Sequence, residues 1–172
     1  MGRAHVLAVA ILGAWLASTL AMWFAATRSF RTVDRALKSG APQFLDLTKP
    51  LGEESTRVAA RYIASEINRA LFWGYGALQI VLGVLLFVLV WRETPRRSVD
   101  VGVTALMLAL SVVLTLVITP LIVSLGRGLD FVPRNPPPPV MPRFWALHGS
   151  FTGLDGVKLL AGLGLLIRWV LR

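Results

Sequence analysis

Four long apolar stretches, separated by polar segments, dominate the pattern of hydrophobic and polar positions along the chain. A helix needs about 20 predominantly apolar residues to cross a bilayer core of roughly 30 Å. Every backbone N–H and C=O group in hydrocarbon must be paired within the chain, so the stretches are predicted to be helices rather than open strands. The predicted spans are residues 5–27, 71–91, 101–125 and 144–171. The pattern therefore predicts an all-α membrane protein, a bundle of four transmembrane helices that forms a single domain over residues 1–172.

A further helix is predicted before the second span, over residues 55–70. Apolar side chains recur there at helical spacing, and basic and polar side chains occupy the other face. The apolar stripe contains Val58, Ala59, Tyr62, Ile63, Ile67, Ala70 and Leu71 at the start of the second span, and the polar face contains Arg57, Arg61, Ser65, Asn68 and Arg69. Such an amphipathic helix either lies in the membrane interface and then turns into the second span, or covers the mouth of the bundle.

Glycines and prolines interrupt two of the connections between spans. Over residues 40–50 they predict a loop. Residues 133–142 form a Pro-rich connector that contains four consecutive prolines, Pro136 to Pro139. Such a run adopts the extended polyproline II conformation, so a stiff spacer is predicted on one side of the membrane.

Composition narrows the classes of function. The chain is 55% hydrophobic and 16% charged, and it has no cysteine, which excludes disulfides, thiolate metal sites and cysteine nucleophiles. The net charge of +9 comes from Lys and Arg residues that lie almost entirely between the apolar stretches, where anionic lipid headgroups meet them. The chain has no nucleic-acid motif and no hydrolase, metalloprotease or P-loop motif. We therefore expect the lipid bilayer as a partner, no nucleic acid and no enzyme activity.

Charge in the connections also bears on orientation. Four spans put both termini on one side of the membrane, together with the second connection. Cytoplasmic connections carry an excess of Lys and Arg. Arg28, Arg31 and Arg35 follow the first span directly, whereas a single arginine, Arg3, precedes it. We expect a protein of the bacterial inner (plasma) membrane, and the charge after the first span favours both termini outside, although the dense "RETPRR" of the second connection favours the opposite orientation.

The fourth span carries charges that a membrane helix must shield. At about 100° per residue, four polar side chains form one stripe along it: His148, Thr152, Asp155 and Lys158. Lys158 lies about 15 Å deeper along the helix axis than His148, near the middle of the bilayer. A lone charge there costs several kcal/mol, so we expect the stripe to face the bundle interior or a wet cavity. Asp155 and Lys158 are spaced to neutralise each other.

Other polar groups within the spans are candidate partners for this stripe. Ser111 and Thr115 recur at helical spacing on the third span, and Gln79 lies in the second. The alternative for the two hydroxyls is a hydrogen bond to their own backbone. Beside the polar stripe lie three glycines, Gly149, Gly153 and Gly156. The GxxxG spacing of the first two lets a neighbouring helix backbone come close.

Three functions are considered for this pattern. First, the protein is a structural or accessory bundle that organises lipid or a partner membrane protein, and the Asp155–Lys158 pair fixes the facing of the fourth helix. Alternatively, the stripe binds or transports a small ion, a proton or a small solute, with His148 as a titratable gate, and the small volume of four helices then implies a homo-oligomer. Haem binding is the third, but His5 and His148 begin helices of opposite direction, so they lie at opposite membrane faces and no cofactor or metal is expected.

The segment "RFWALHGSFTGLD" resembles the last-helix signature of the transmembrane-protein-205-like family, also catalogued as domain of unknown function 4149. In that signature a basic-aromatic lead-in precedes His-Gly, with Asn or Asp seven residues after the His, and His148, Gly149 and Asp155 match it. Phe151 stands where the family has Ser. The segments "FAATRSFRTV", "INRALFWGY" and "ITPLI" are similar to the family as well. The resemblance implies a four-helix membrane domain without an established biochemical role.

Overall fold

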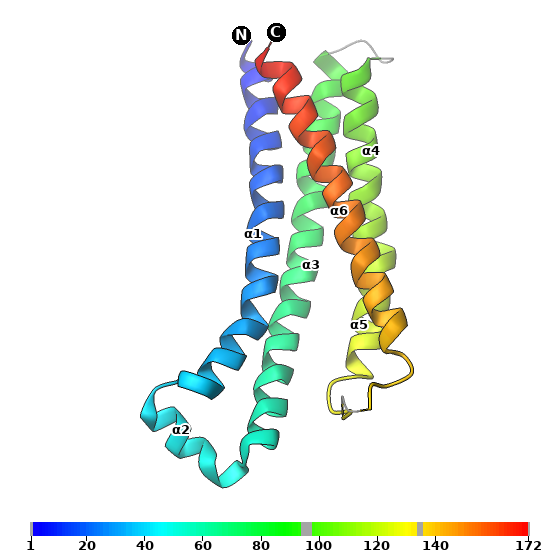
Figure 1. Ribbon diagram of the computed structural model, residues 1–172. Helices are drawn as coiled ribbons and strands as arrows, with labels where there is room; N and C mark the ends of the chain where they lie inside the picture. The colour runs from blue at the N-terminus through cyan, green and yellow to red at the C-terminus, as the bar shows by residue number, and fades with distance from the viewer. Residues whose placement is uncertain (1, 94–97, 134–135, 172) are drawn as a thin grey trace.

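The computed structural model describes residues 2–93, 98–133 and 136–171. All regular structure in these ranges is helical, which confirms the expected all-α class. Four long helices run beside one another, and shorter elements join or interrupt them (Figure 1). The elements are α1 (Arg3–Ser39), α2 (Pro42–Thr48), the 3-10 turn η1 (Lys49–Leu51), α3 (Glu53–Glu93), α4 (Val99–Val113), the π-helical turn η2 (Leu114–Ile118), α5 (Thr119–Arg127) and α6 (Met141–Val170).

The long helices form an up-and-down bundle in which α4, η2 and α5 act as one helix. α1 packs against both α3 and α6, and α4 packs against the same two helices. α3 and α6 therefore face each other across the bundle, and they run in the same direction (Figure 1). The two ends of the chain lie together at one end of the bundle, and α2 lies at the opposite end.

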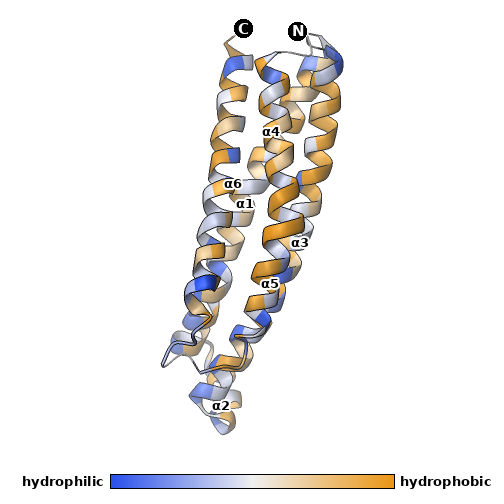
Figure 2. Ribbon diagram, turned by 90° about the vertical axis from the view of Figure 1, so that its right-hand side faces the viewer, coloured by the Kyte–Doolittle hydropathy of each residue, from blue (hydrophilic) through white to orange (hydrophobic). Residues whose placement is uncertain are grey.

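In the described part of the chain, four helices are long and apolar enough to cross a membrane: α1, α3, the continuous helix from Val99 to Arg127, and α6. Figure 2 shows apolar residues along most of their length and hydrophilic residues gathered toward the helix ends and around α2. Each predicted span falls on one of these helices. The described structure thus has the four-helix architecture of a membrane-embedded protein.

The connection between the first two spans is more helical than expected. α1 continues past Thr27 to Ser39, because no helix-breaking residue occurs before Gly40. The loop predicted over residues 40–50 is mostly α2 and η1. The chain then turns into α3 at Gly52, whose φ of 75° lies in the left-handed region that glycine adopts without strain.

The amphipathic helix predicted over residues 55–70 exists, but it does not turn before the second span. It is the first part of α3, which continues without interruption for 41 residues. α3 contains no proline, and its glycines are tolerated within a helix. No residue therefore breaks the backbone between the amphipathic segment and the span.

Only part of the polar face of this segment points inward, since Asn68 and Arg69 are buried whereas Arg61 is exposed, and part of its apolar stripe points outward. Arg61 and Asn68 bond to α1 side chains at 3.0 and 2.8 Å, and Arg69 pairs with an aspartate beyond α5 at 2.6 Å. The exposed fractions of Ile63 and Ile67 are 59% and 52%. The polar contacts to neighbouring helices fix this orientation.

The π-helical turn η2 widens the third membrane helix just before Pro120. The Thr119 hydroxyl donates to the Leu114 carbonyl at 2.9 Å, across the wide turn. Proline lacks an N–H, and in a regular α-helix its ring clashes with the carbonyl four residues earlier. A π turn makes room for the ring, so the helix continues through Pro120 to Arg127.

The Pro-rich connector predicted over residues 133–142 ends earlier than expected, because α6 begins at Met141. Pro142 occupies the first turn of α6, where the missing N–H costs no intrahelical hydrogen bond. Residues 134–135 of the connector lie outside the described residues.

Apolar side chains fill the bundle in two clusters. The cluster nearer the chain ends contains Ala8, Leu12, Trp15, Leu16, Leu86, Val90, Val101, Met107, Leu159, Leu165 and Trp169. The cluster nearer α2 contains Met22, Tyr75, Leu114, Ile118, Ile122 and Phe151. Along α6, Asp155 and Lys158 lie between Phe151 of one cluster and Leu159 of the other. The charged pair therefore lies where the two apolar clusters meet.

Candidate functional site

Asp155 and Lys158 form a buried ion pair inside the bundle. Their exposed fractions are 0% and 1%, and Lys158 Nζ lies 2.7 Å from Asp155 Oδ1. The i, i+3 spacing on α6 puts both side chains on the same helix face. Because an isolated charge in an apolar interior is very unfavourable, this contact is what permits either group to be ionised there.

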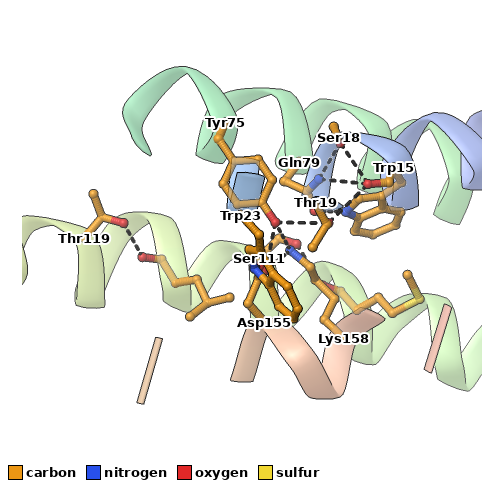
Figure 3. A network of polar contacts seen from close by, with 12 residues as sticks. Trp15, Ser18, Thr19, Trp23, Tyr75, Gln79, Ser111, Thr119, Asp155 and Lys158 are labelled. Carbon is orange, nitrogen blue, oxygen red and sulfur yellow. Dashed lines mark hydrogen bonds and ion pairs between the residues drawn. The ribbon is translucent and has the colours of Figure 1, made fainter. Parts of the chain in front are cut away.

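Two aromatic side chains from other helices complete the hydrogen bonding of Asp155 (Figure 3). The Trp23 indole N–H on α1 donates to Oδ2 at 2.8 Å, and the Tyr75 hydroxyl on α3 donates to Oδ1 at 2.8 Å. Asp155 therefore accepts from groups on α1, α3 and α6. The carboxylate thus joins three of the four long helices. Charge-assisted hydrogen bonds of this kind are about twice as strong as neutral ones.

Tyr75 also contacts the cation of the pair. Lys158 Nζ donates to the Tyr75 hydroxyl oxygen at 3.1 Å and lies 5.1 Å from the centroid of its ring. A cation near the face of an aromatic ring is attracted by the quadrupole of the ring. Amphipathic rings near the ends of a membrane span usually lie at the interface, but Tyr75 is buried, and its hydroxyl meets both charged groups.

A second hydrogen-bonded group adjoins this cluster on the α1–α3 side. Gln79 accepts from the Trp15 indole N–H and donates to Ser18 Oγ at 2.8 Å. The Thr19 hydroxyl lies 3.1 Å from the Tyr75 hydroxyl and links the two groups (Figure 3). Gln79, a predicted partner of the polar stripe, is thus buried nearby but bonds to α1 rather than to Asp155.

The other two predicted partners point elsewhere. The Ser111 hydroxyl donates to the Met107 carbonyl of its own helix at 3.0 Å. The Thr115 side chain fills the space beside Gly76 of α3, where an added Cβ would come within 2.6 Å of it. Hydrogen bonding to the local backbone, the alternative considered for these hydroxyls, is what the structure gives for Ser111.

The predicted stripe on α6 is divided by the structure. The buried face of α6 includes Phe151, Asp155 and Lys158, and Thr152 is exposed because it lies about 120° around the helix from Lys158. His148 is half-buried among three aromatic rings, with centroid distances of 4.5 to 6.5 Å. It lies about 10 Å along the helix axis from Asp155. Thr152 is therefore not part of the buried cluster, and His148 lies apart from it.

The expectation that small residues beside the stripe admit a neighbouring backbone is also not met within this chain. An added Cβ would meet nothing within 4 Å at Gly149 or Gly153, and at Gly156 it would meet the Trp23 ring at 3.9 Å. Farther along α6, an added Cβ at Gly162 would come within 2.7 Å of Leu16 on α1. Close helix packing thus occurs one to two turns beyond the predicted stripe.

A second buried carboxylate, outside the stripe predicted on the fourth span, lies near the chain ends. Asp100 in the first turn of α4 is 1% exposed. Arg168 Nε donates to its Oδ1 at 2.9 Å, and the Trp169 indole N–H donates to its Oδ2 at 3.1 Å. Like Asp155, it pairs with a cation and an indole donor. The sequence feature that indicates this contact is the acid Asp100 at the start of the third span together with the Arg168–Trp169 pair at the end of the fourth.

The two histidines lie at opposite ends of the bundle. His5 is 6.0 Å from the Trp169 ring near the chain ends, whereas His148 contacts Phe144 near the start of α6. Among the described residues, no group of three or more His, Cys, Asp or Glu side chains could hold a metal ion. Around Asp155 and Gln79 the bundle gathers one carboxylate, one amine, one phenol, one amide, two indoles and two hydroxyls. Comparison of the chain with models of protein families, with curated proteins and with solved structures found no match.

Proposed function

We propose that this protein is a structural or accessory integral membrane protein, and that the Asp155 cluster fixes how its helices pack. The observation that carries the proposal is that side chains of the protein itself supply the hydrogen-bond and ion-pair partners of the cluster. Asp155 is fully buried, and both of its oxygens accept from side chains of the protein. A buried polar network whose members are satisfied specifies one arrangement of its helices.

Charge balance supports this role. The pair is neutral overall when both groups are ionised, and the bonds from Trp23 and Tyr75 hold the carboxylate in one position. A rotation or slip of α6 would leave a charge without partners in an apolar environment, which costs several kcal/mol. The cluster therefore favours a single register of α6 against α1 and α3.

The alternative is a site that binds or moves a proton, an ion or a small solute. The observation that favours it is a continuous hydrogen-bonded chain from Thr19 through the Tyr75 hydroxyl to Lys158 and Asp155. Such a chain connects side chains that carry exchangeable protons. This function also needs a route for water or ions to the cluster, and a homo-oligomer is one way to provide it.

Removing the charges separately and together tests both functions. Asp155→Asn or Lys158→Met alone leaves one buried charge unpaired, so we expect each to lower the free energy of unfolding in detergent by about 3 kcal/mol. The double variant removes both charges and should lose clearly less than the sum. Thr152→Val, on the exposed side of the same helix, is the matched control and should stay within about 0.5 kcal/mol.

Proton or cation flux into vesicles distinguishes the alternative. If the double variant unfolds like the native protein yet loses a flux that the native protein supports, the cluster is a transport site and the structural proposal fails. Single variants as stable as the native chain would also contradict the structural role.

We also propose a membrane location for the protein and a relationship to a known family. The resemblance to transmembrane-protein-205-like domains and the positive charge after the first span support a bacterial inner-membrane protein with both termini outside. Its partners are then the lipid bilayer and a membrane protein or a second copy of the chain. Neither nucleic-acid binding nor an enzyme activity is part of the proposal.

A further inference from the structure

Four cations line the exposed face of α1 where the helix leaves its apolar stretch. Arg28, Arg31, Arg35 and Lys38 are all exposed, and we call them the cationic row. Their spacing of three, four and three residues keeps them within an arc of about 80° around the helix. The row therefore presents its charges on a single face.

Within the described residues, no ion pair neutralises the charge of the row. Ion pairs join Asp34 to Arg61, Asp46 to Lys49, Glu53 to Arg57, Glu66 to Arg69 and Arg127, Asp130 to Arg69, Asp155 to Lys158, and Asp100 to Arg168. None of these pairs, in the part of the chain that the structure describes, uses a member of the row. Arg28 lies over the Phe24 ring at 4.7 Å, a contact that leaves its charge in place. The row thus offers four positive charges to a partner.

Before the row begins, the same face of α1 carries exposed apolar side chains. Leu20 and Phe24 lie on the same side of α1 as the row, and their exposed fractions are 54% and 62%. In a membrane, acyl chains would cover these two side chains. Arg28 lies about 6 Å farther along the axis than Phe24, so the headgroups of the same lipids meet the beginning of the row.

The direction of α1 keeps the rest of the row close to the membrane surface. In Figure 1, the last turns of α1 lean away from α3 and run obliquely to the axis of the bundle. Arg35 and Lys38 therefore lie nearer the bilayer surface than they would on a helix that continued straight along the bundle axis.

We propose that the cationic row binds the phosphate groups of anionic phospholipids in the leaflet on the α2 side of the protein. The continuity of the row with Leu20 and Phe24 favours lipid over a soluble acidic partner, because the row begins where lipid chains end. The inference rests on the membrane embedding of the chain, but not on the role of the Asp155 cluster. Each cation near an anionic surface contributes about fivefold to the affinity.

The natural absence of cysteine allows a local probe. Thr32→Cys, exposed on α1 beside the row, would carry a bimane fluorophore in protein reconstituted into phosphatidylcholine vesicles. Phosphatidylglycerol or phosphatidylcholine with a nitroxide high on the acyl chain then quenches the probe on contact. We expect the anionic lipid to associate at least fivefold more strongly, with the preference falling as salt is raised.

A charge-matched comparison isolates the row. Changing its four members to Gln should bring the preference for phosphatidylglycerol close to one. The control changes four cations elsewhere to Gln: Arg3, Lys49, Arg57 and Arg92. It should keep the native preference. Retention of every variant in carbonate-washed vesicles checks membrane embedding independently.

Three results would overturn the inference. Equal quenching by the two lipids in the native chain would show that the row has no preference for anionic headgroups. An equal loss in the control would show that net charge, rather than the row, sets the preference. A response to soluble polyglutamate without any lipid preference would assign the row to an acidic protein instead.

Discussion

At the scale of single residues, the indole N–H of Trp23 donates a hydrogen bond to Asp155 Oδ2 at 2.8 Å, and no other described side chain is seen to donate to this oxygen. Trp23→Phe keeps most of the apolar volume and removes this donor. We expect the free energy of unfolding in detergent to fall by about 1–2 kcal/mol, because a buried carboxylate oxygen loses its partner. Trp145, 62% exposed on α6, provides the control: Trp145→Phe should change stability by less than about 0.5 kcal/mol. Equal losses in both variants would contradict the assigned role of the indole.

The charged pair could be predicted from the sequence, but its aromatic partners could not. Asp155 and Lys158 stand out because charges are rare in an apolar helix and their spacing lets them meet. Trp23 and Tyr75 have ordinary explanations as packing or interface residues in a membrane helix. Nothing in the pattern states which way each ring faces. A further cue is that a carboxylate has more acceptor sites than one lysine fills, so a buried Asp–Lys pair calls for additional donors nearby.

At the scale of helices, the close contact between α3 and η2 depends on Gly76. An added Cβ there would lie 2.6 Å from the Thr115 methyl and hydroxyl and 3.1 Å from its Cβ, so rotating the threonine side chain cannot make enough room. Gly76→Ala should therefore destabilise the protein by about 1–3 kcal/mol, despite the higher helix propensity of alanine.

Gly74, two residues earlier on the same helix, is the matched control. An added Cβ there meets nothing within 4 Å, so Gly74→Ala should be neutral or stabilising by up to about 1 kcal/mol. Thr115→Ala combined with Gly76→Ala should recover part of the loss. If Gly76→Ala and Gly74→Ala behave alike in denaturation experiments, the contact with η2 does not limit helix packing.

The helix periodicity of residues 55–70 was predictable, but the direction of its faces was not. In a water-soluble protein the apolar stripe would face the core, whereas here the partners of the polar face, such as Asp34 for Arg61, lie on neighbouring helices. These partners are distant in sequence, so periodicity alone does not reveal them. The continuity of the segment with the second span was more accessible, since helices end at breaking residues rather than where hydropathy falls.

At the scale of the whole molecule, the long helices extend beyond the bilayer on one side. Trp73 and Trp91, both partly exposed on α3, are about 27 Å apart along the axis, close to the thickness of a hydrocarbon core. α3 begins at Glu53, about 30 Å before Trp73 along the axis. The hairpin formed by the end of α1, by α2 and by the start of α3 therefore projects from the membrane on the side away from the chain ends.

The charges of this hairpin are the basis of the proposed direction of insertion. The cationic row follows the first span and has no acidic partner among the residues that the structure describes, and the cytoplasmic side of a membrane protein retains such charges. Single cysteines in the cysteine-free chain test the orientation. In intact cells, a membrane-impermeant maleimide should label Gly2→Cys, whereas Leu47→Cys on α2 and Val132→Cys beyond α5 should react only after the membrane is permeabilised. Reaction of the latter two in intact cells would reverse the orientation. Reaction of Leu47→Cys and Val132→Cys from different sides would contradict the four-span arrangement, since both connections lie at the same end of the bundle.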